Sequence, residues 1–271
     1  MSGRASLVLA IESSCDETGV AVVQGGRRIL AQAVASQIAL HAPAGGIVPE
    51  LAARAHLRWI VPALEEVLAT AGITIGEVDA IAVTAGPGLA GSLLVGIAFA
   101  KTLAWAYRRP LVGVNHLEGH LYAAWLLDPG ERERPEPPFP LVALVVSGGH
   151  TFLVEMRDHL AYRLLGETVD DAAGEAFDKA GRLLGLGYPG GPAIAAAAAR
   201  SRARDAVLPR AWLGKSYDFS FSGLKTALRR QVEVDLAAPG RAPPPPGGPR
   251  EPPPRKQKDG GLHDAVVYVN A

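Results

Sequence analysis

The chain has 271 residues, and its 27 lysines and arginines balance 27 aspartates and glutamates, so the formal net charge is zero. A nucleic-acid partner would therefore need a local basic patch, because no global positive field attracts it. The single cysteine, Cys15, excludes an intrachain disulfide and fits a reducing compartment. No secretory pattern opens the chain, and the longest apolar run, residues 89–106, contains Lys101, so we expect a soluble, cytoplasmic protein without a membrane span.

The first motif is a strand, a polar turn and a second strand. Residues 7–11 and 19–23 are apolar runs typical of buried strands, and the turn between them contains Glu12, Asp16 and Glu17. Such a turn presents backbone N–H groups and short polar side chains, which suit an anion or a bound water. An ordinary hairpin has the same pattern, although three acids are more than a turn requires.

Two helices preceded by glycine-containing loops follow. The first is predicted over residues 51–69, with a basic group that we expect to be a solvated face rather than a phosphate patch. This group consists of Arg54, His56 and Arg58. A strand over residues 78–84 leads to a turn with Gly86 and Gly88 and then to the second helix. The Gly-Lys-Ser/Thr ending of a P-loop is absent, so we expect these glycines to serve packing.

The stretch from Asn115 to His120 follows a short apolar strand at residues 111–114. Asn115 fits a helix N-cap, and Glu118 stands three residues later, where a capping carboxylate acts. His116 and His120 are then one turn apart on one face and can converge on a divalent metal; a pair of surface histidines is the alternative. A zinc peptidase needs its glutamate directly after the first histidine, so the pattern disfavours a peptidase.

A second strand-turn-strand unit spans residues 141–155, after a loop rich in proline and charge at residues 128–140. Its turn is Ser147, Gly148 and Gly149, and the two glycines leave room for a phosphate to approach the backbone. Two such units in one chain indicate an internally duplicated α/β fold with a ligand between the halves.

The last third of the chain combines polar motifs with a change of composition. A helix from about residue 168 is predicted to place acids on one solvated face, and a glycine turn at residues 188–192 offers backbone to a ligand. The acids are Asp171, Glu175 and Asp178. Nine of the 22 prolines lie between residues 239 and 254, so we expect residues 233–271 to form a disordered tail.

Together, eight ordered motifs resemble the universal tRNA threonylcarbamoyladenosine transferase family, bacterial type, formerly called glycoprotease. The motifs are residues 11–19, 45–52, 84–88, 116–120, 146–151, 170–179, 188–192 and 219–225. The resemblance extends over about residues 7–230. It implies an α/β fold of the actin/Hsp70-like (sugar kinase-like) type with two duplicated lobes, residues 1–120 and 121–232, of which the second is incomplete.

The same resemblance implies an activity and a set of site residues. The family moves a threonylcarbamoyl group from its adenylate to the N6 amine of the adenosine beside the tRNA anticodon. By position, Glu12 and Asp16 match catalytic acids, and His116 and His120 match the ligands of one iron or zinc ion per subunit. The positions that match the nucleotide-substrate site are Val145, Val146, Ser147, Gly148, Gly149, Asp178 and Gly191. The implied partners are tRNA, threonylcarbamoyl-adenylate, a paralogous subunit and a small P-loop ATPase.

The sequence departs from the family after about residue 230. Family members continue with an Asn-Arg segment that completes the nucleotide site and with an Asp-Asn motif that supplies a third metal ligand, and this sequence has neither. We therefore expect the chain by itself to be aggregation-prone and to lack transfer activity. Two other functions stay open, a non-catalytic scaffold subunit of the same fold and a metal-dependent phosphotransferase.

Overall fold

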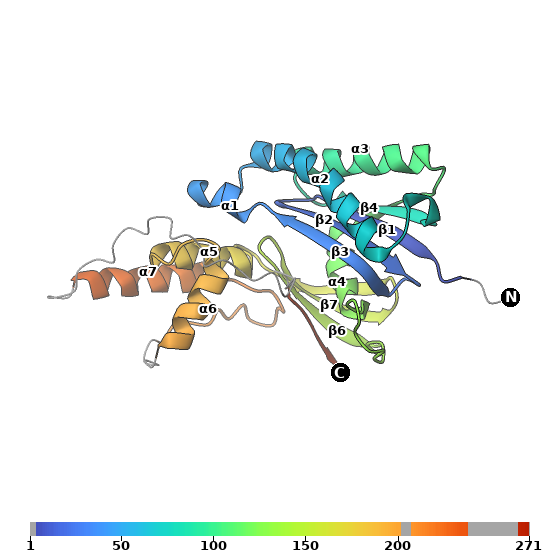
Figure 1. The fold of residues 1–271 in the computed structure, drawn as a ribbon. Coiled ribbons are helices and arrows are strands. Elements are labelled where there is room, and N and C mark those ends of the chain that lie inside the picture. The colour runs from blue at the N-terminus through green and yellow to red at the C-terminus, as the bar shows by residue number, and fades with distance from the viewer. Residues whose placement is uncertain (1–3, 202–206, 238–264, 271) are drawn as a thin grey trace. The chain divides into compact units, whose positions relative to one another are not determined.

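The computed structural model describes residues 4–201, 207–237 and 265–270 (Figure 1). The chain divides into two compact units, Met1–Pro137 and Pro138–Ala271, which we call unit 1 and unit 2. Each unit is built around its own β-sheet. None of the described helices is both long and apolar enough to cross a membrane.

Unit 1 contains a five-stranded sheet in the order β3-β2-β1-β4-β5. Its strands are β1 (Leu7–Glu12), β2 (Glu17–Gln24), β3 (Arg28–Ser36), β4 (Ala80–Gly86) and β5 (Leu111–Asn115). Strands β1, β2 and β3 pair antiparallel, whereas β1, β4 and β5 run parallel. Strand β3 was not predicted from the sequence, and its alternating Ile29, Ala31 and Ala33 are buried in the core.

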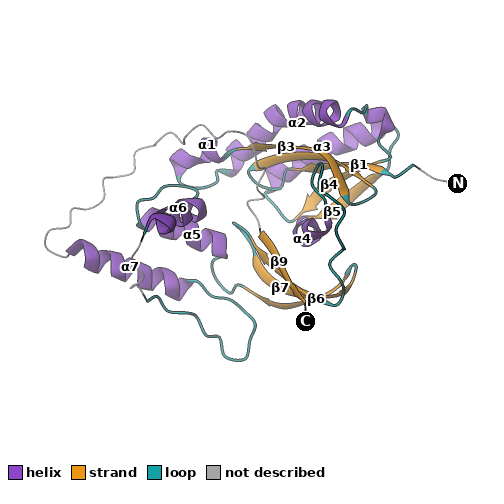
Figure 2. Ribbon diagram, turned by 60° about the horizontal axis from the view of Figure 1, so that its bottom comes forward, coloured by secondary structure: helices purple, strands orange, loops and turns teal. Residues whose placement is uncertain are grey.

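The two long helices of unit 1 lie side by side along the sheet (Figures 1 and 2). The helices are α1 (Ile38–His41), α2 (Pro49–Ala71), α3 (Ala90–Ala106) and α4 (His116–Tyr122), with 3₁₀ turns η1 (Ala42–Ala44), η2 (Ile75–Glu77) and η3 (Ala123–Trp125). Helix α2 begins at Pro49, whose fixed φ suits the first helical position, and ends at Gly72 with a left-handed φ of 67°. Fully buried Leu9, Val67 and Ile81 show that the core lies between these helices and the sheet.

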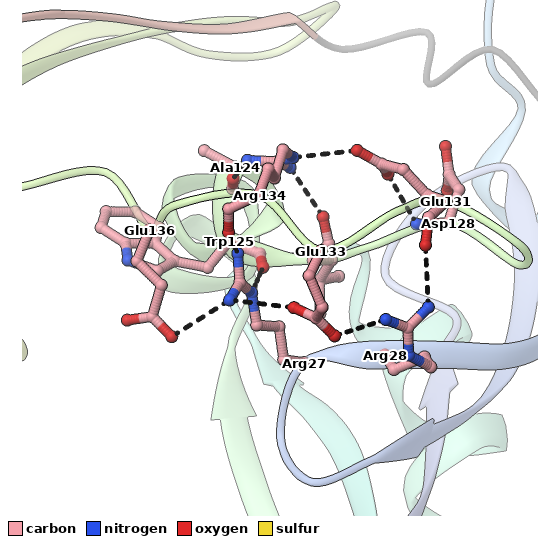
Figure 3. Close-up of polar contacts among 10 residues, drawn as sticks. Arg27, Arg28, Ala124, Trp125, Asp128, Glu131, Glu133, Arg134 and Glu136 are labelled. Atoms are coloured by element: carbon pink, nitrogen blue, oxygen red, sulfur yellow. Dashed lines mark hydrogen bonds and ion pairs between the residues drawn. The ribbon is translucent and has the colours of Figure 1, made fainter.

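The unit boundary lies after residue 137, later than the predicted boundary after residue 120, because the intervening segment is bound to the β2–β3 hairpin. The Leu127 N–H donates to the Arg27 carbonyl at 2.9 Å, and the Leu127 carbonyl accepts from the Ile29 N–H at 2.9 Å. The Arg27 guanidinium lies 3.5 Å from the Glu133 carboxylate and 3.6 Å from that of Glu136 (Figure 3). Residues 121–137 therefore belong to unit 1.

Unit 2 contains a four-stranded antiparallel sheet in the order β8-β7-β6-β9 (Figure 2). Its strands are β6 (Leu141–Val146), β7 (Thr151–Asp158), β8 (Ala161–Glu167) and β9 (Ala265–Asn270). Its helices are α5 (Ala173–Leu183), α6 (Gly190–Arg200) and α7 (Ser222–Ala237). The two sheets with their helices are the α/β architecture that the sequence predicted.

The prediction of a disordered tail needs correction at both of its ends. Helix α7 continues to Ala237, and residues 265–270 form β9, which pairs with β6 from Leu141 opposite Asn270 to Val146 opposite Ala265. Residues 238–264 lie outside the described residues. The last strand is rich in β-branched residues, which favour extended structure once a sheet edge is available for pairing. Composition alone does not reveal that edge.

Asp170 and Asp171, which precede α5, form hydrogen bonds and ion pairs that connect the segment before α5 to α7 and its N-terminal flank. The Asp170 carboxylate accepts hydrogen bonds from the Phe221 N–H at 2.7 Å and the Ser220 hydroxyl at 2.6 Å, at the start of α7. Partial burial raises the pKa of Asp170, but these hydrogen bonds outweigh that effect and hold it well below its usual range. Asp171 accepts from Lys179 at 2.5 Å and Lys225 at 2.7 Å, so it links α5 to α7 rather than joining a solvated acidic face.

Candidate functional site

The paired histidines lie on the helix that their spacing predicted. The Asn115 side chain caps α4 by accepting from the Leu117 N–H at 2.8 Å and the Glu118 N–H at 3.4 Å. His116 and His120 face each other across one turn, with ring centroids 4.4 Å apart and their Nε2 atoms 3.0 Å apart. His120 is buried. The pair is therefore a convergent site rather than two separate surface histidines.

The carboxylate of Glu12, at the end of β1, contacts the Nδ1 atom of His116. Its Oε2 atom lies 3.3 Å from His116 Nδ1 and accepts from the Thr84 hydroxyl at 2.5 Å, while Oε1 accepts from the Ser14 N–H. Burial raises the pKa of Glu12, but the hydrogen bonds from His116, Ser14 and Thr84 outweigh it and lower the pKa to about 2. Glu12 is thus ionised at neutral pH.

An ionised Glu12 selects one tautomer of His116. A carboxylate can only accept, so we assign the proton to Nδ1, which leaves the Nε2 lone pair of His116 pointing toward His120. The two Nε2 atoms can then face a single cation. In the structure these two atoms are hydrogen-bonded to each other at 3.0 Å, and a bound cation would take the place of that hydrogen bond. The pair fits a divalent metal.

The described residues supply only these two strong ligands. Among them, no group of three or more histidine, cysteine, aspartate or glutamate side chains is arranged to hold a metal ion. Glu12 occupies the Nδ1 side of His116, opposite the Nε2 atom. A carboxylate in this place can orient the imidazole that it contacts.

A buried histidine, His56, contacts the backbone of the β1–β2 turn, a role that was not predicted from the sequence. His56 was expected on a solvated face with Arg54 and Arg58, which are exposed, but His56 is fully buried. Its Nδ1 lies 2.7 Å from the Thr18 hydroxyl, and its Nε2 lies 3.0 Å from the Cys15 carbonyl. Burial lowers the pKa of His56, so it acts as a neutral support. A histidine on an apolar helix face was the available signal.

Glycines of the β4–α3 segment let this turn pack against its neighbours, as the sequence predicted. A Cβ at Gly88 would lie 2.6 Å from the Ser14 carbonyl, and one at Gly96 would lie 2.2 Å from the Ser13 hydroxyl. Asp16 is half-buried on the same turn, and its carbonyl accepts from the Gln37 N–H at 3.1 Å. Burial and the neighbouring Asp16 raise the pKa of Cys15 to about 12, so its thiol stays protonated and unreactive at neutral pH.

The second glycine turn, in unit 2, is closed on itself by Ser147. The Ser147 hydroxyl accepts from the His150 N–H at 2.9 Å and the Gly149 N–H at 3.3 Å. A Cβ at Gly148 or Gly149 would meet nothing within 4 Å, so the space above the turn is open. Neither glycine has a positive φ, so open space, not backbone strain, is the argument for glycine here.

The N-terminus of α5 is seated against this turn. The Gly174 N–H donates to the Ser147 carbonyl at 3.1 Å, and a Cβ on Gly174 would lie 2.5 Å from that oxygen. The turn therefore adjoins the N-terminus of an 11-residue helix, whose dipole favours anions, while the Ala173 N–H donates to the Thr151 hydroxyl at 2.8 Å. Val145 is fully buried in the sheet, so only its backbone can meet a ligand, and Val146 is half-buried.

The other two predicted nucleotide positions of unit 2 also lie next to each other. The Asp178 carboxylate of α5 accepts from the Gly190 N–H at 2.7 Å, directly before Gly191 in α6. A Cβ at Gly190 would lie 2.2 Å from the Phe177 carbonyl, so only glycine permits this approach of α6 to α5. The predicted residues therefore form two local clusters in unit 2 and one in unit 1.

Comparison with known proteins supplies the family. Residues 28–241 match the family described as tRNA N6-adenosine threonylcarbamoyltransferase. A protein of that name from Thermomicrobium roseum is 63% identical over 235 residues, covering 87% of this chain and 64% of the relative. Those from Symbiobacterium thermophilum and Moorella thermoacetica are 56% and 57% identical, covering 84% and 82% of this chain and 65% and 63% of the relatives. The chain thus spans somewhat less than two thirds of these relatives' length. With the motifs in their expected order on an α/β scaffold of the actin/Hsp70-like type, the chain belongs to the tRNA N6-adenosine threonylcarbamoyltransferase family.

Proposed function

We propose that this protein transfers the threonylcarbamoyl group from threonylcarbamoyl-adenylate to N6 of the adenosine beside the tRNA anticodon. Family membership supports the reaction class. The observation that carries the proposal is the convergence of the His116 and His120 Nε2 atoms at 3.0 Å, with Glu12 fixing the His116 tautomer. A carboxylate on the second ring nitrogen is the usual partner of a metal-binding histidine.

The residues that would hold the metal are His116 and His120, with iron(II) as the ion we propose and zinc(II) as its alternative, one per subunit. When bound, such an ion polarises the acceptor carbonyl or holds the leaving phosphate. Glu12, with a pKa of about 2, is too weak a base to accept a proton at neutral pH. We therefore assign it a positioning role, which is to keep the Nε2 atom of His116 available.

Asp16 is the acid on the same turn to which we assign the proton transfer. The N6 amine attacks the carbamoyl carbon, the bond from that carbon to the phosphate oxygen breaks, and AMP leaves. The N6 proton passes to the Asp16 carboxylate. An adenine amine is a poor nucleophile because its lone pair is delocalised into the ring, so a carboxylate that orients it and takes its proton promotes the attack. Asp16 keeps part of its surface accessible for this.

Unit 2 would bind the adenylate. The open space above the Ser147–Gly149 turn and the positive end of the adjoining α5 dipole suit the phosphate, whose charge grows as the anhydride bond breaks. Asp178 and Gly191, beside the α5–α6 approach, suit the nucleoside. tRNA is the acceptor that we propose. The family resemblance also supports a paralogous subunit and a small P-loop ATPase as partners, in the cytoplasm.

The test is mass spectrometry of nucleosides from tRNA incubated with threonylcarbamoyl-adenylate and iron(II). Because the described residues supply two metal ligands, the protein is assayed as given and with residues from Glu233 onward replaced by the corresponding segment of the Thermomicrobium roseum relative. We expect threonylcarbamoyladenosine from the second protein and its loss in His116→Ala. No product from the second protein, under conditions where the relative itself is active, would refute the proposal.

A further inference from the structure

The segment of residues 207–217, between α6 and α7, exposes large apolar side chains to an unusual degree. Val207 is 94% exposed, Trp212 86% and Tyr217 65%. Arg210 and Lys215 are exposed among them, and the segment contains no aspartate or glutamate. Three exposed apolar side chains within eleven residues, interspersed with two exposed cations, point to a ligand.

The end of this segment is fixed to β8. Phe219 pairs with the chain after β8, since its N–H donates to the Glu167 carbonyl at 3.0 Å and its carbonyl accepts from the Val169 N–H at 2.9 Å. The Asp218 carboxylate accepts from the Glu167 N–H at 3.0 Å. A Cβ on Gly166 would lie 2.3 Å from the Tyr217 carbonyl, so the Tyr217 backbone rests directly on the strand. The Tyr217 ring is therefore exposed on an anchored backbone and not on a frayed end.

Aromatic faces interleaved with cations match the chemistry of unpaired nucleotides. Bases stack on tryptophan and tyrosine rings, and phosphates pair with arginine and lysine. The segment contains no acid that could pair with its two cations. A protein partner that buried these rings would therefore also have to supply negative charge for both cations. The zero net charge of the whole chain makes such a local patch necessary for any RNA contact.

We propose that residues 207–217 bind unpaired nucleotides of the RNA substrate, with Trp212 and Tyr217 stacking on bases and Arg210 and Lys215 pairing with phosphates. The identity of that RNA as tRNA rests on the proposed function. The segment leads into α7 of unit 2, whereas the histidine cluster belongs to unit 1. Single-stranded loops, whose bases are unstacked, are the expected ligand.

The test measures binding of a fluorescein-labelled RNA hairpin with an anticodon-type loop to the full chain, by fluorescence anisotropy over a range of salt concentrations. Trp212→Ala is expected to weaken binding roughly tenfold or more, and Trp212→Phe far less, because phenylalanine still stacks. The matched control is Trp105→Ala in α3 of unit 1, since Trp105 is 85% exposed and should leave affinity unchanged. Arg210→Ala should lower the slope of log affinity against log salt by about 0.7 for one lost phosphate.

Each outcome decides something. The stacking surface is overturned if Trp212→Ala and Trp105→Ala weaken hairpin binding equally. It is also overturned if Trp212→Ala lowers the affinity for a blunt RNA duplex as much as the affinity for the hairpin. The stacking surface is likewise overturned if Trp212→Ala abolishes binding to a protein partner but leaves hairpin binding unchanged. Failure of the unaltered chain to bind the hairpin overturns both this inference and the tRNA substrate. Hairpin binding that depends on Trp212, together with no product from the segment-exchanged protein, supports this inference and counts against the proposed function.

Discussion

Gly174 is the position where one added methyl group should disturb the nucleotide cluster of unit 2. Its Cβ would lie 2.5 Å from the Ser147 carbonyl and 2.7 Å from Gly148 Cα, both backbone atoms that no side-chain rotation can remove. Ordinary contacts begin at 3.4 Å, so in Gly174→Ala the helix and the turn must separate by 0.9 Å, the difference of 3.4 and 2.5. Overpacking of this kind costs about 1–3 kcal/mol, which exceeds a helix-propensity gain of about 1 kcal/mol.

Two measurements check this. We expect the melting temperature of Gly174→Ala to fall by roughly 2–8 °C, and its affinity for AMP, measured by calorimetry, to fall about tenfold or more because the turn is displaced. The control is Gly223→Ala, near the start of α7, where a Cβ meets nothing within 4 Å and stability should stay the same or rise. Identical melting and AMP binding in the two variants would refute the steric reasoning.

Three further predictions concern other parts of the chain. Elemental analysis should find less than one iron or zinc per chain, and only background levels in His116→Ala. Glu12→Gln, which loses the orienting carboxylate, should bind the metal about 10- to 100-fold more weakly. Full metal occupancy that resists a chelator would contradict this prediction. The depressed pKa of Asp170 adds stability above the unfolded pKa of about 3.9 and loses it as pH falls through the folded pKa. Acid unfolding of Asp170→Asn should therefore be less steep below about pH 4, and an unchanged profile would count against a stabilising role for the Asp170 hydrogen bonds. Gly96→Ala should lower the melting temperature, because its Cβ would lie 2.2 Å from the Ser13 hydroxyl; unchanged melting would show that the serine moves freely.

Sequence alone determined the features that depend on neighbours along the chain. The spacing of His116 and His120 and the cap at Asn115 follow from helix periodicity, which acts within one turn. The apolar runs of β1, β2, β6 and β7 follow from the period of a strand, and the glycines before α3 from the need for close packing. The ordered motifs indicated the family for the same reason, since each is a short local pattern.

Tertiary structure decided the features that join distant residues. Glu12 reaches His116 across 104 positions, and this contact contributes to a pKa of about 2, on which the proposed orienting role rests. His56 lies between two arginines in a stretch that predicts a solvated helix face, but it is buried because α2 covers the β1–β2 turn. β9 exists because β6 has an edge to pair with, and Trp212 stays exposed because nothing in the described chain covers it. Burial and hydrogen bonding depend on which segments meet in space, and no local pattern encodes that meeting.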